Sequence, residues 1–182
     1  MMPYIIVGIV LAAVVMWFIS TQRALAMLDE NINNAMSQIG VQLSSRWDAL
    51  SALLDLTKGY AEHEYKTLLQ TVRARRSITA DSSAEDAAAQ ENMLVQAMGR
   101  IMAVAEQYPA LKADASYQKT MDSVNQYEVM VRQSRLIYND SVTKLNRQLR
   151  MFPTSMVAGL LGFVKRDYLE AQEGKADMPS MK

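Results

Sequence analysis

His63 is the only histidine in this 182-residue chain, and it stands between two glutamates, Glu62 and Glu64. A metal site needs several ligands that converge on one point, whereas adjacent residues of a helix point away from one another. Ser-His-Asp catalysis would have to use His63 as its base, and no nucleophile motif accompanies it. Cysteine and the common phosphate-binding and G-x-S-x-G patterns are absent. We therefore predict no catalytic, cofactor-binding or metal-binding residues, and we place His63 on a solvated helix face.

Two charged residues interrupt the most regular apolar pattern in the chain. Residues 117–152 repeat apolar side chains at alternating spacings of four and three, which is typical of a coiled coil sustained for five heptads. Glu128 and Arg135 fall on this apolar seam. A buried charge is costly unless it is paired, so the pattern predicts a polar layer between helices that fixes their register. The predicted members are Arg46, Asp48, Glu62, Glu128 and Arg135, with Glu64 as a further candidate. The alternative is that both long side chains reach the surface along their apolar stems.

The N-terminal residues predict a membrane anchor. Residues 4–19 carry no charge, and with their neighbours they approach the 20 or so helical residues that cross roughly 30 Å of hydrocarbon. Pro3 suits the first turn of a helix, and Tyr4 and Trp17 lie where aromatic residues anchor a span at its ends. We predict a single transmembrane helix over residues 1–22, with membrane lipid as its partner.

A cleavable signal peptide is the alternative for this segment, because residues 24–26 match the small-x-small cleavage pattern. No Lys or Arg precedes the apolar run, however, and the run is long for a signal peptide. Arg23 is the basic residue nearest the span, and it favours a cytoplasmic location for the C-terminal body. The expected location is therefore the cytoplasmic membrane, with a single crossing.

Beyond the anchor the sequence predicts an all-α fold, a long antiparallel bundle of three or four helices. Apolar residues spaced three or four apart predict a first helix that ends near Arg76, and whether it breaks near Gly40 is left open. A second helix is expected from the N-cap Ser83 to about Gln107, and a third from Ser116 to Phe152. The predicted organisation is an anchor over 1–22, a bundle over 23–164 and a polar tail over 165–182.

The predicted helix lengths do not match one another. At 1.5 Å per residue, a first helix that continues to residue 76 is too long for the second to retrace, so the third would overshoot it. Its uncovered seam would then mark an assembly surface. The apolar segment 156–164 would lie far from the bilayer, or in the membrane interface if the first helix breaks near Gly40. The residues of the predicted assembly seam are Tyr138, Val142, Leu145, Leu149 and Phe152.

Composition excludes one class of partner and favours another. Lys and Arg together number 19, as do Asp and Glu, so the net charge is zero. Proteins that bind nucleic acid use a basic excess against the phosphate backbone, so we expect no nucleic acid partner. The chain holds 14 methionines, and methionine packs adaptably both in cores and at protein–protein surfaces.

Several stretches of the chain resemble the LemA family, in order and over nearly the whole length. They are VQL at 41–43 with Arg46 and Asp48, KGYAEHE at 58–64, Ala74 and Arg75, AVAEQYPALKA at 103–113, Tyr127 and Glu128, Ser134 and Arg135, YND at 138–140, Asn146, FPTSMVA at 152–158 and GF at 162–163. The chain departs from the family in its first helix, where residues 48–53 read DALSAL in place of the usual Asp-Leu-Ile-Pro-Asn-Leu and one arginine remains of a basic run. The resemblance implies a bacterial single-pass membrane protein with a helical bundle in the cytoplasm and no agreed biochemical activity.

Three functions are compatible with these features. The leading prediction is a membrane-anchored, self-associating scaffold of the bacterial envelope that is not an enzyme and forms a homo-oligomer. The alternative is an adaptor that uses the same surface to hold another membrane protein. A hydrolase that uses carboxylates or His63 ranks last, because no motif accompanies these residues.

Overall fold

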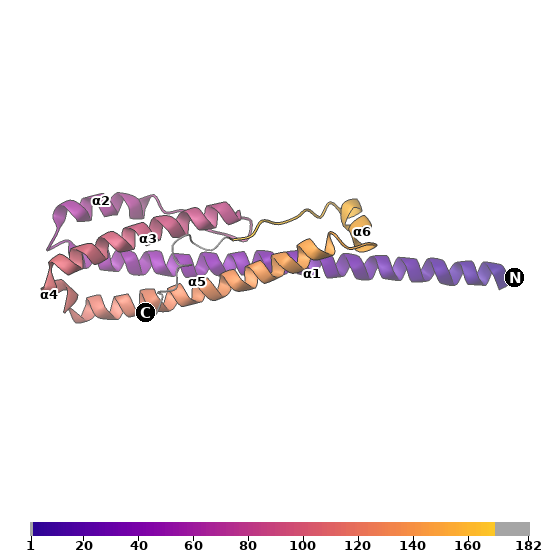
Figure 1. Ribbon diagram of the computed structural model, residues 1–182, viewed down its shortest axis with the longest axis horizontal. Coiled ribbons are helices and arrows are strands. Elements are labelled where there is room, and N and C mark those ends of the chain that lie inside the picture. The colour runs from indigo at the N-terminus through magenta and orange to yellow at the C-terminus, as the bar shows by residue number, and fades with distance from the viewer. Residues whose placement is uncertain (1, 170–182) are drawn as a thin grey trace, which may run out of the picture. The chain divides into compact units, whose positions relative to one another are not determined.

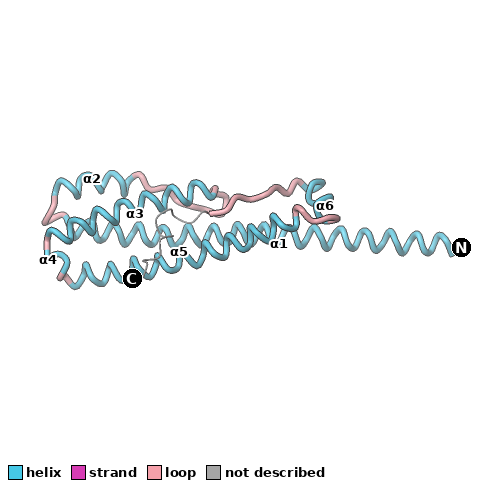
Figure 2. Tube along the Cα trace, viewed as in Figure 1, coloured by secondary structure: helices cyan, strands magenta, loops and turns pink. Residues whose placement is uncertain are grey.

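The computed structural model of this chain describes residues 2–169, and its described residues form helices and connecting loops without strands (Figures 1 and 2). The prediction of an all-α fold with a long apolar N-terminal helix is therefore confirmed. Residues 170–182 of the predicted polar tail lie outside the described part. The helices, in chain order, are α1 (Met2–Thr57), α2 (Glu62–Arg73), α3 (Ala84–Gln107), α4 (Pro109–Lys112), α5 (Ala115–Gln148) and α6 (Thr154–Leu161).

The chain divides into two compact units, and α1 and α5 each contribute to both. We call the first the anchor unit; it consists of Met1–Asn34 and Ile137–Tyr168. We call the second the four-helix unit; of the described residues it contains Ala35–Leu136 and Leu169. Each unit is described separately below.

In the four-helix unit, the later part of α1, α2, α3 and the first part of α5 run alternately up and down (Figures 1 and 2). Their apolar faces meet in one core that includes Trp47, Leu54 and Leu68. Trp47 is 2% exposed and Leu54 is 1% exposed. The short α4 bridges α3 and α5, and it begins at Pro109, whose missing N–H is harmless at a first helical position.

The first helix ends earlier than the prediction of Arg76. A turn at residues 58–60 follows Thr57, and the amides of Tyr60 and Ala61 both donate to the Thr57 carbonyl. Gly59, a poor helix former, lies within this turn. The reversal of the chain lets α2 pack on α3. Leu68, 1% exposed, is buried by this return, whereas an unbroken helix would leave its apolar face without a neighbour.

The N-terminus of α3 follows its prediction. Ser83 is the N-cap, and its hydroxyl accepts a hydrogen bond from the Asp86 amide at 3.0 Å. The Asp86 carboxylate in turn accepts from the Ser83 hydroxyl and amide, which completes a capping box. These bonds to the ionised form lower the pKa of the exposed Asp86 carboxyl.

Gly40 does not break α1, and its role is steric. The loop between α2 and α3 crosses α1 at this position, and a Cβ on Gly40 would overlap the carbonyl oxygen of Ile78. The loop is held there by the Arg76 amide, which donates to Oε1 of Gln90 at 2.8 Å. A residue without a side chain is therefore needed at position 40 for the loop to lie against the helix.

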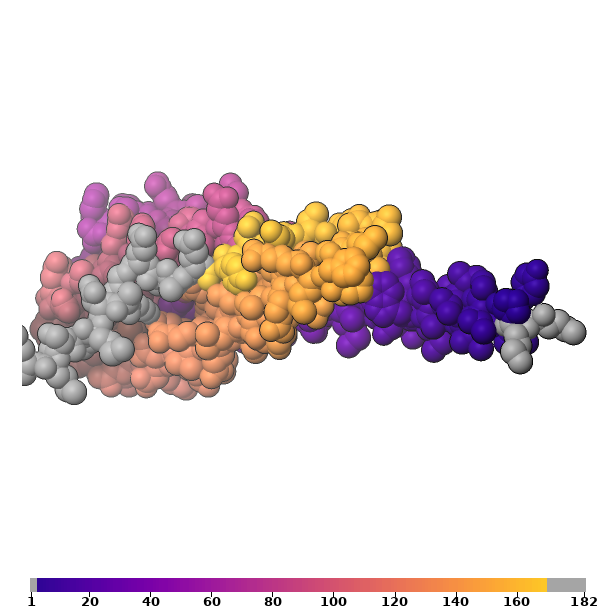
Figure 3. All heavy atoms as spheres, turned by 45° about the vertical axis from the view of Figure 1, so that its right-hand side comes forward, coloured from indigo at the N-terminus to yellow at the C-terminus, as the bar shows by residue number. Residues whose placement is uncertain are grey.

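In the anchor unit, the apolar part of α1 stands bare and its continuation is covered. An 18-residue window of α1 has a mean hydropathy of 2.4 and no buried residue, so this helix is long and apolar enough to cross a membrane. On the face seen in Figure 3, no other described segment covers the first turns of α1. Farther along α1, the side chains of Phe18 and Thr21 are half-buried, and those of Leu25 and Ile32 are fully buried on the covered face of the helix.

Gly40→Ala is expected to lower the melting temperature of the full chain by several degrees, because the new methyl group must displace the backbone at Ile78. Thermal unfolding followed by circular dichroism in lipid nanodiscs measures the change. Gly99→Ala in the middle of α3 is the matched control, since a Cβ there meets no atom within 4 Å. The control is expected to be neutral or to stabilise by up to about 1 kcal/mol. Equal effects of the two substitutions would contradict the steric role of Gly40.

Candidate functional site

An ionic layer crosses the apolar core of the four-helix unit. Arg46 of α1 is 2% exposed, and its Nη2 lies 3.7 Å from Oε2 of Glu128 on α5. Nη1 of Arg135, also on α5, donates to Oε2 of Glu91 on α3 at 2.9 Å. The layer thus joins α1, α3 and α5 through two cations and two carboxylates.

Burial dominates the electrostatics of Arg46. Desolvation lowers the pKa of its guanidinium, and the carboxylates of Glu128 and Glu91 oppose that shift. Glu128 is less buried, with 28% of its side chain exposed, and it also lies 3.3 Å from Nη2 of Arg132. The buried Arg46 guanidinium therefore depends on the Glu128 carboxylate for charge compensation more than Glu128 depends on Arg46.

The structure brings together three of the five residues predicted for the polar layer, Arg46, Glu128 and Arg135, within the same unit. Asp48 lies on the surface instead, where Oδ1 accepts from Arg75 at 2.6 Å. It follows Arg46 by two positions, which turns its side chain to the other side of the helix. Glu62 is exposed at the start of α2 and pairs with Lys66 at 2.8 Å.

Glu91 was missed by the sequence reasoning, although the pattern carried a signal. The apolar face of α3 includes Leu94 and Met98, and the position three before Leu94 continues that face. Extended by one turn towards the N-terminus of α3, this apolar face predicts that the Glu91 carboxylate lies on the buried side of the helix. His63 is exposed, and no group of three or more potential metal ligands occurs among residues 2–169.

The predicted assembly seam is mostly covered by the chain itself, which corrects the prediction of an uncovered seam. Tyr138, Val142 and Leu145 are buried within the anchor unit, and Leu149 is half-buried. Only Phe152 is open to solvent, at 80% exposure. The last turns of α5 and the N-terminal part of α1 belong to the same unit and lie beside each other there (Figure 1).

The segment after α6 is fastened to both long helices of the anchor unit. Asn146 donates to the Arg166 carbonyl at 2.9 Å and accepts from the Arg166 amide at 3.0 Å. The Arg166 guanidinium bonds Oδ1 of Asp29 at 2.8 Å and 3.1 Å, and the Tyr138 hydroxyl donates to the Asp167 carbonyl at 3.0 Å. Burial raises the pKa of this tyrosine.

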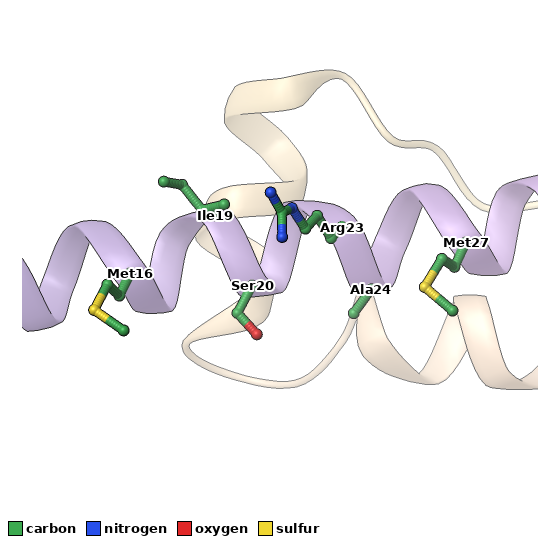
Figure 4. A pocket seen from close by; sticks show the side chains of 6 residues that line it. All are labelled: Met16, Ile19, Ser20, Arg23, Ala24 and Met27. Atoms are coloured by element: carbon green, nitrogen blue, oxygen red, sulfur yellow. The ribbon is translucent and has the colours of Figure 1, made fainter.

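Both units carry open hollows on their surfaces. In the four-helix unit, one of 280 Å³ lies beside Gly40, Arg75 and Arg76, and another of 330 Å³ lies between α1 and α5 beside Asp48 and Lys119. A third hollow, of 520 Å³, follows α1 in the anchor unit (Figure 4). Its lining residues are Met16, Ile19, Ser20, Arg23, Ala24 and Met27.

Removing the two partners of the ionic layer one at a time is expected to have unequal effects. Glu128→Leu leaves the buried Arg46 without its nearest carboxylate and should destabilise the unit by about 3 kcal/mol. Arg46→Leu should cost less, because Glu128 keeps Arg132 and water. The double variant should recover most of the loss, since an apolar pair replaces an ionic one. Denaturant unfolding of all four proteins gives the cycle, and additive losses would contradict the pairing.

Asn146→Leu is expected to release the segment around Arg166, because it removes both hydrogen bonds to the Arg166 backbone. The loss should amount to about 1–3 kcal/mol of local stability. Hydrogen exchange at the Arg166 amide measures it directly. Lys144→Leu, which removes only an exposed pair with Asp140, is the control and should leave this amide protected. Unchanged protection in Asn146→Leu would show that the segment is held by other contacts.

Comparison with known proteins places the chain in a family. Magnetosome proteins MamQ 1 and MamQ 2 of Paramagnetospirillum magneticum strain AMB-1 are each 31% identical to it over 74 residues, which is 41% of this chain and 27% of each relative. The match thus spans about a quarter of the length of these curated relatives. The profile of the LemA family matches residues 35–182, which is most of the chain. The protein therefore belongs to the LemA family.

Proposed function

We propose that this protein is a membrane-anchored scaffold of the bacterial envelope that associates with copies of itself. The observation that carries the proposal is the bare apolar part of α1, which continues without interruption into a helix of the bundle. An uncharged helix of this length is stable in the hydrocarbon of a membrane, because its backbone N–H and C=O groups are hydrogen-bonded within the helix. The helix that spans the membrane would thus be the same helix that enters the bundle.

The outer face of the four-helix unit supports self-association. Val129 and Leu136 of α5 are 53% and 67% exposed, and they lie seven residues apart on one face of the helix. Val95 and Met102 of α3 repeat the same spacing and are 39% and 46% exposed. Such narrow apolar stripes are the usual contacts between helices of neighbouring molecules. They replace the predicted seam as the proposed assembly surface.

The proposed orientation places the bundle in the cytoplasm. Arg23 follows the apolar run directly, and basic residues near the end of a span favour the cytoplasmic side.

Size measurement of the full chain in a mild detergent tests the scaffold proposal. Light scattering after size exclusion should give a protein mass that is a multiple of 20.4 kDa. Leu136→Glu should shift the particle towards the monomer, because it places a charge in the proposed contact. Gln70→Glu adds the same charge at an exposed position of α2, outside both stripes, and should leave the size unchanged. A monomeric wild-type protein would overturn the proposal.

Crosslinking in cells separates the scaffold from the adaptor. A photoreactive residue at position 129 should yield mainly products between copies of this chain. One dominant product with a different protein would favour the adaptor instead.

A further inference from the structure

Residues 151–164 of the anchor unit are uncharged and largely exposed. Arg150 precedes this segment, and Lys165 and Arg166 follow it. Val157 and Ala158 of α6 pack inward and are buried. The opposite side carries apolar groups outward, at exposures between 42% and 80%. These exposed residues are Met151, Phe152, Met156, Leu160, Leu161 and Val164.

The position of this segment along α1 points to what covers it. The unit holds only two chain segments, so residues 137–168 provide the cover that begins on α1 at Phe18. α6 lies beside α1 in Figure 1, and Figure 4 shows its ribbon next to the part of α1 that carries Ile19 and Arg23. Farther from the anchor, Arg166 is tied to Asp29. The exposed apolar side of α6 therefore lies where the uncharged run of α1 ends.

Membrane dimensions place this level in the headgroup region. The hydrocarbon core is about 30 Å thick and the whole bilayer about 40–45 Å, which leaves about 5–8 Å of headgroup layer on each side. Ile19 to Arg23 rises about 6 Å along a helix. If the hydrocarbon ends near Ile19, a segment beside these residues occupies the interface, where amphipathic elements bury their apolar side.

The charges around the segment fit the same environment. Arg150 and Lys165 are exposed, and Arg23 is exposed on α1 in the hollow that Figure 4 shows. Met16, Ile19 and Met27 line that hollow beside Arg23, so a cation lies among apolar side chains. Cations at the rim of an apolar surface are the arrangement that binds the phosphates of anionic lipids.

We propose that residues 151–164 form a second membrane contact, seated in the interface of the leaflet from which α1 emerges, with Arg150 and Lys165 at the lipid phosphates. The inference rests on the proposed membrane anchoring by α1. It also departs from both sequence-based alternatives, since α1 passes Gly40 unbroken and α6 nevertheless lies beside the end of the anchor. Two contacts, one spanning and one interfacial, would fix how the anchor unit is turned about the axis of α1.

A fluorescent label at single cysteines tests the contact in the full chain, which has no cysteine of its own. Leu160→Cys reports on the segment, and Val41→Cys, 55% exposed on α1 in the four-helix unit and outside the proposed contact between copies, is the matched control. In nanodiscs that contain anionic lipid, a nitroxide on the lipid near the headgroup should quench the label at 160 strongly and the label at 41 weakly. Iodide in water should show the reverse order.

Two results would overturn the contact. Strong quenching by iodide at position 160 would show that water covers the segment. Protection from both quenchers would show that protein, such as a second copy, covers it. Met16→Cys reports on the anchor itself, at a position 71% exposed in the structure. Lipid quenching at 16 without quenching at 160 rejects only this inference, whereas its absence at 16 rejects the anchoring.

Replacing the basic residues tests the role of the lipid charge. Arg150→Gln and Lys165→Gln should each shift the equilibrium of the segment between anionic membrane and water roughly fivefold towards water, as followed by lipid quenching of the label at position 160. This is the effect of about 1 kcal/mol per basic residue near such a surface. Neutral phosphatidylcholine nanodiscs should remove the difference between these variants and the wild type. The same loss in neutral membranes would contradict binding to lipid phosphate.

Discussion

The covering of a single long helix governs how this protein is built. α1 presents apolar side chains on all sides over its first turns, and then narrows to a stripe that includes Leu25, Ile32 and Ile39. An all-round apolar surface is typical of a membrane span or of a helix inside a large core, whereas an apolar stripe packs against protein. The rest of the chain supplies that protein, with α5 and its following segment in the anchor unit and with α2, α3 and α5 in the four-helix unit.

Long apolar stripes that pack side by side do not by themselves fix the register of the helices, because neighbouring helices can slide by one turn and still bury similar groups. We propose that the ionic layer around Arg46 opposes such a slip, because a slip would separate Glu128 and Glu91 from the guanidinium groups of Arg46 and Arg135. Apolar residues in their places would pack as well or better. We therefore expect the layer to contribute more to the alignment of the helices than to net stability.

The sequence supported the class of fold, the boundaries of α3 and the apolar anchor, because capping chemistry and hydrophobic periodicity are local signals. It did not support the end of α1, since the reversal after Thr57 is decided by what α2 can bury against α3. The predicted surplus of uncovered apolar surface was also wrong, because Tyr138 and Val142 are buried within the anchor unit.

The ionic layer shows the same division between local and distant information. Glu128 and Arg135 stood out because they interrupt a regular repeat, and Arg46 is their neighbour in the same core. The partner of Arg135 depended on the facing of α3, which periodicity gives only when the pattern is followed to its first turn. Arg166 lies outside every helix, so no periodic signal connected it with Asn146 or Asp29.

The double hydrogen bond between Asn146 and Arg166 has a consequence for tolerance to change. It closes a loop between residues 20 positions apart in the chain, and this loop contains α6. The entropy of closing a loop grows slowly with length, by about 0.6 kcal/mol for each doubling. A change in the length of the intervening segment therefore adds little entropic cost, while the Asn146 side chain continues to hold the far end of that segment against α5.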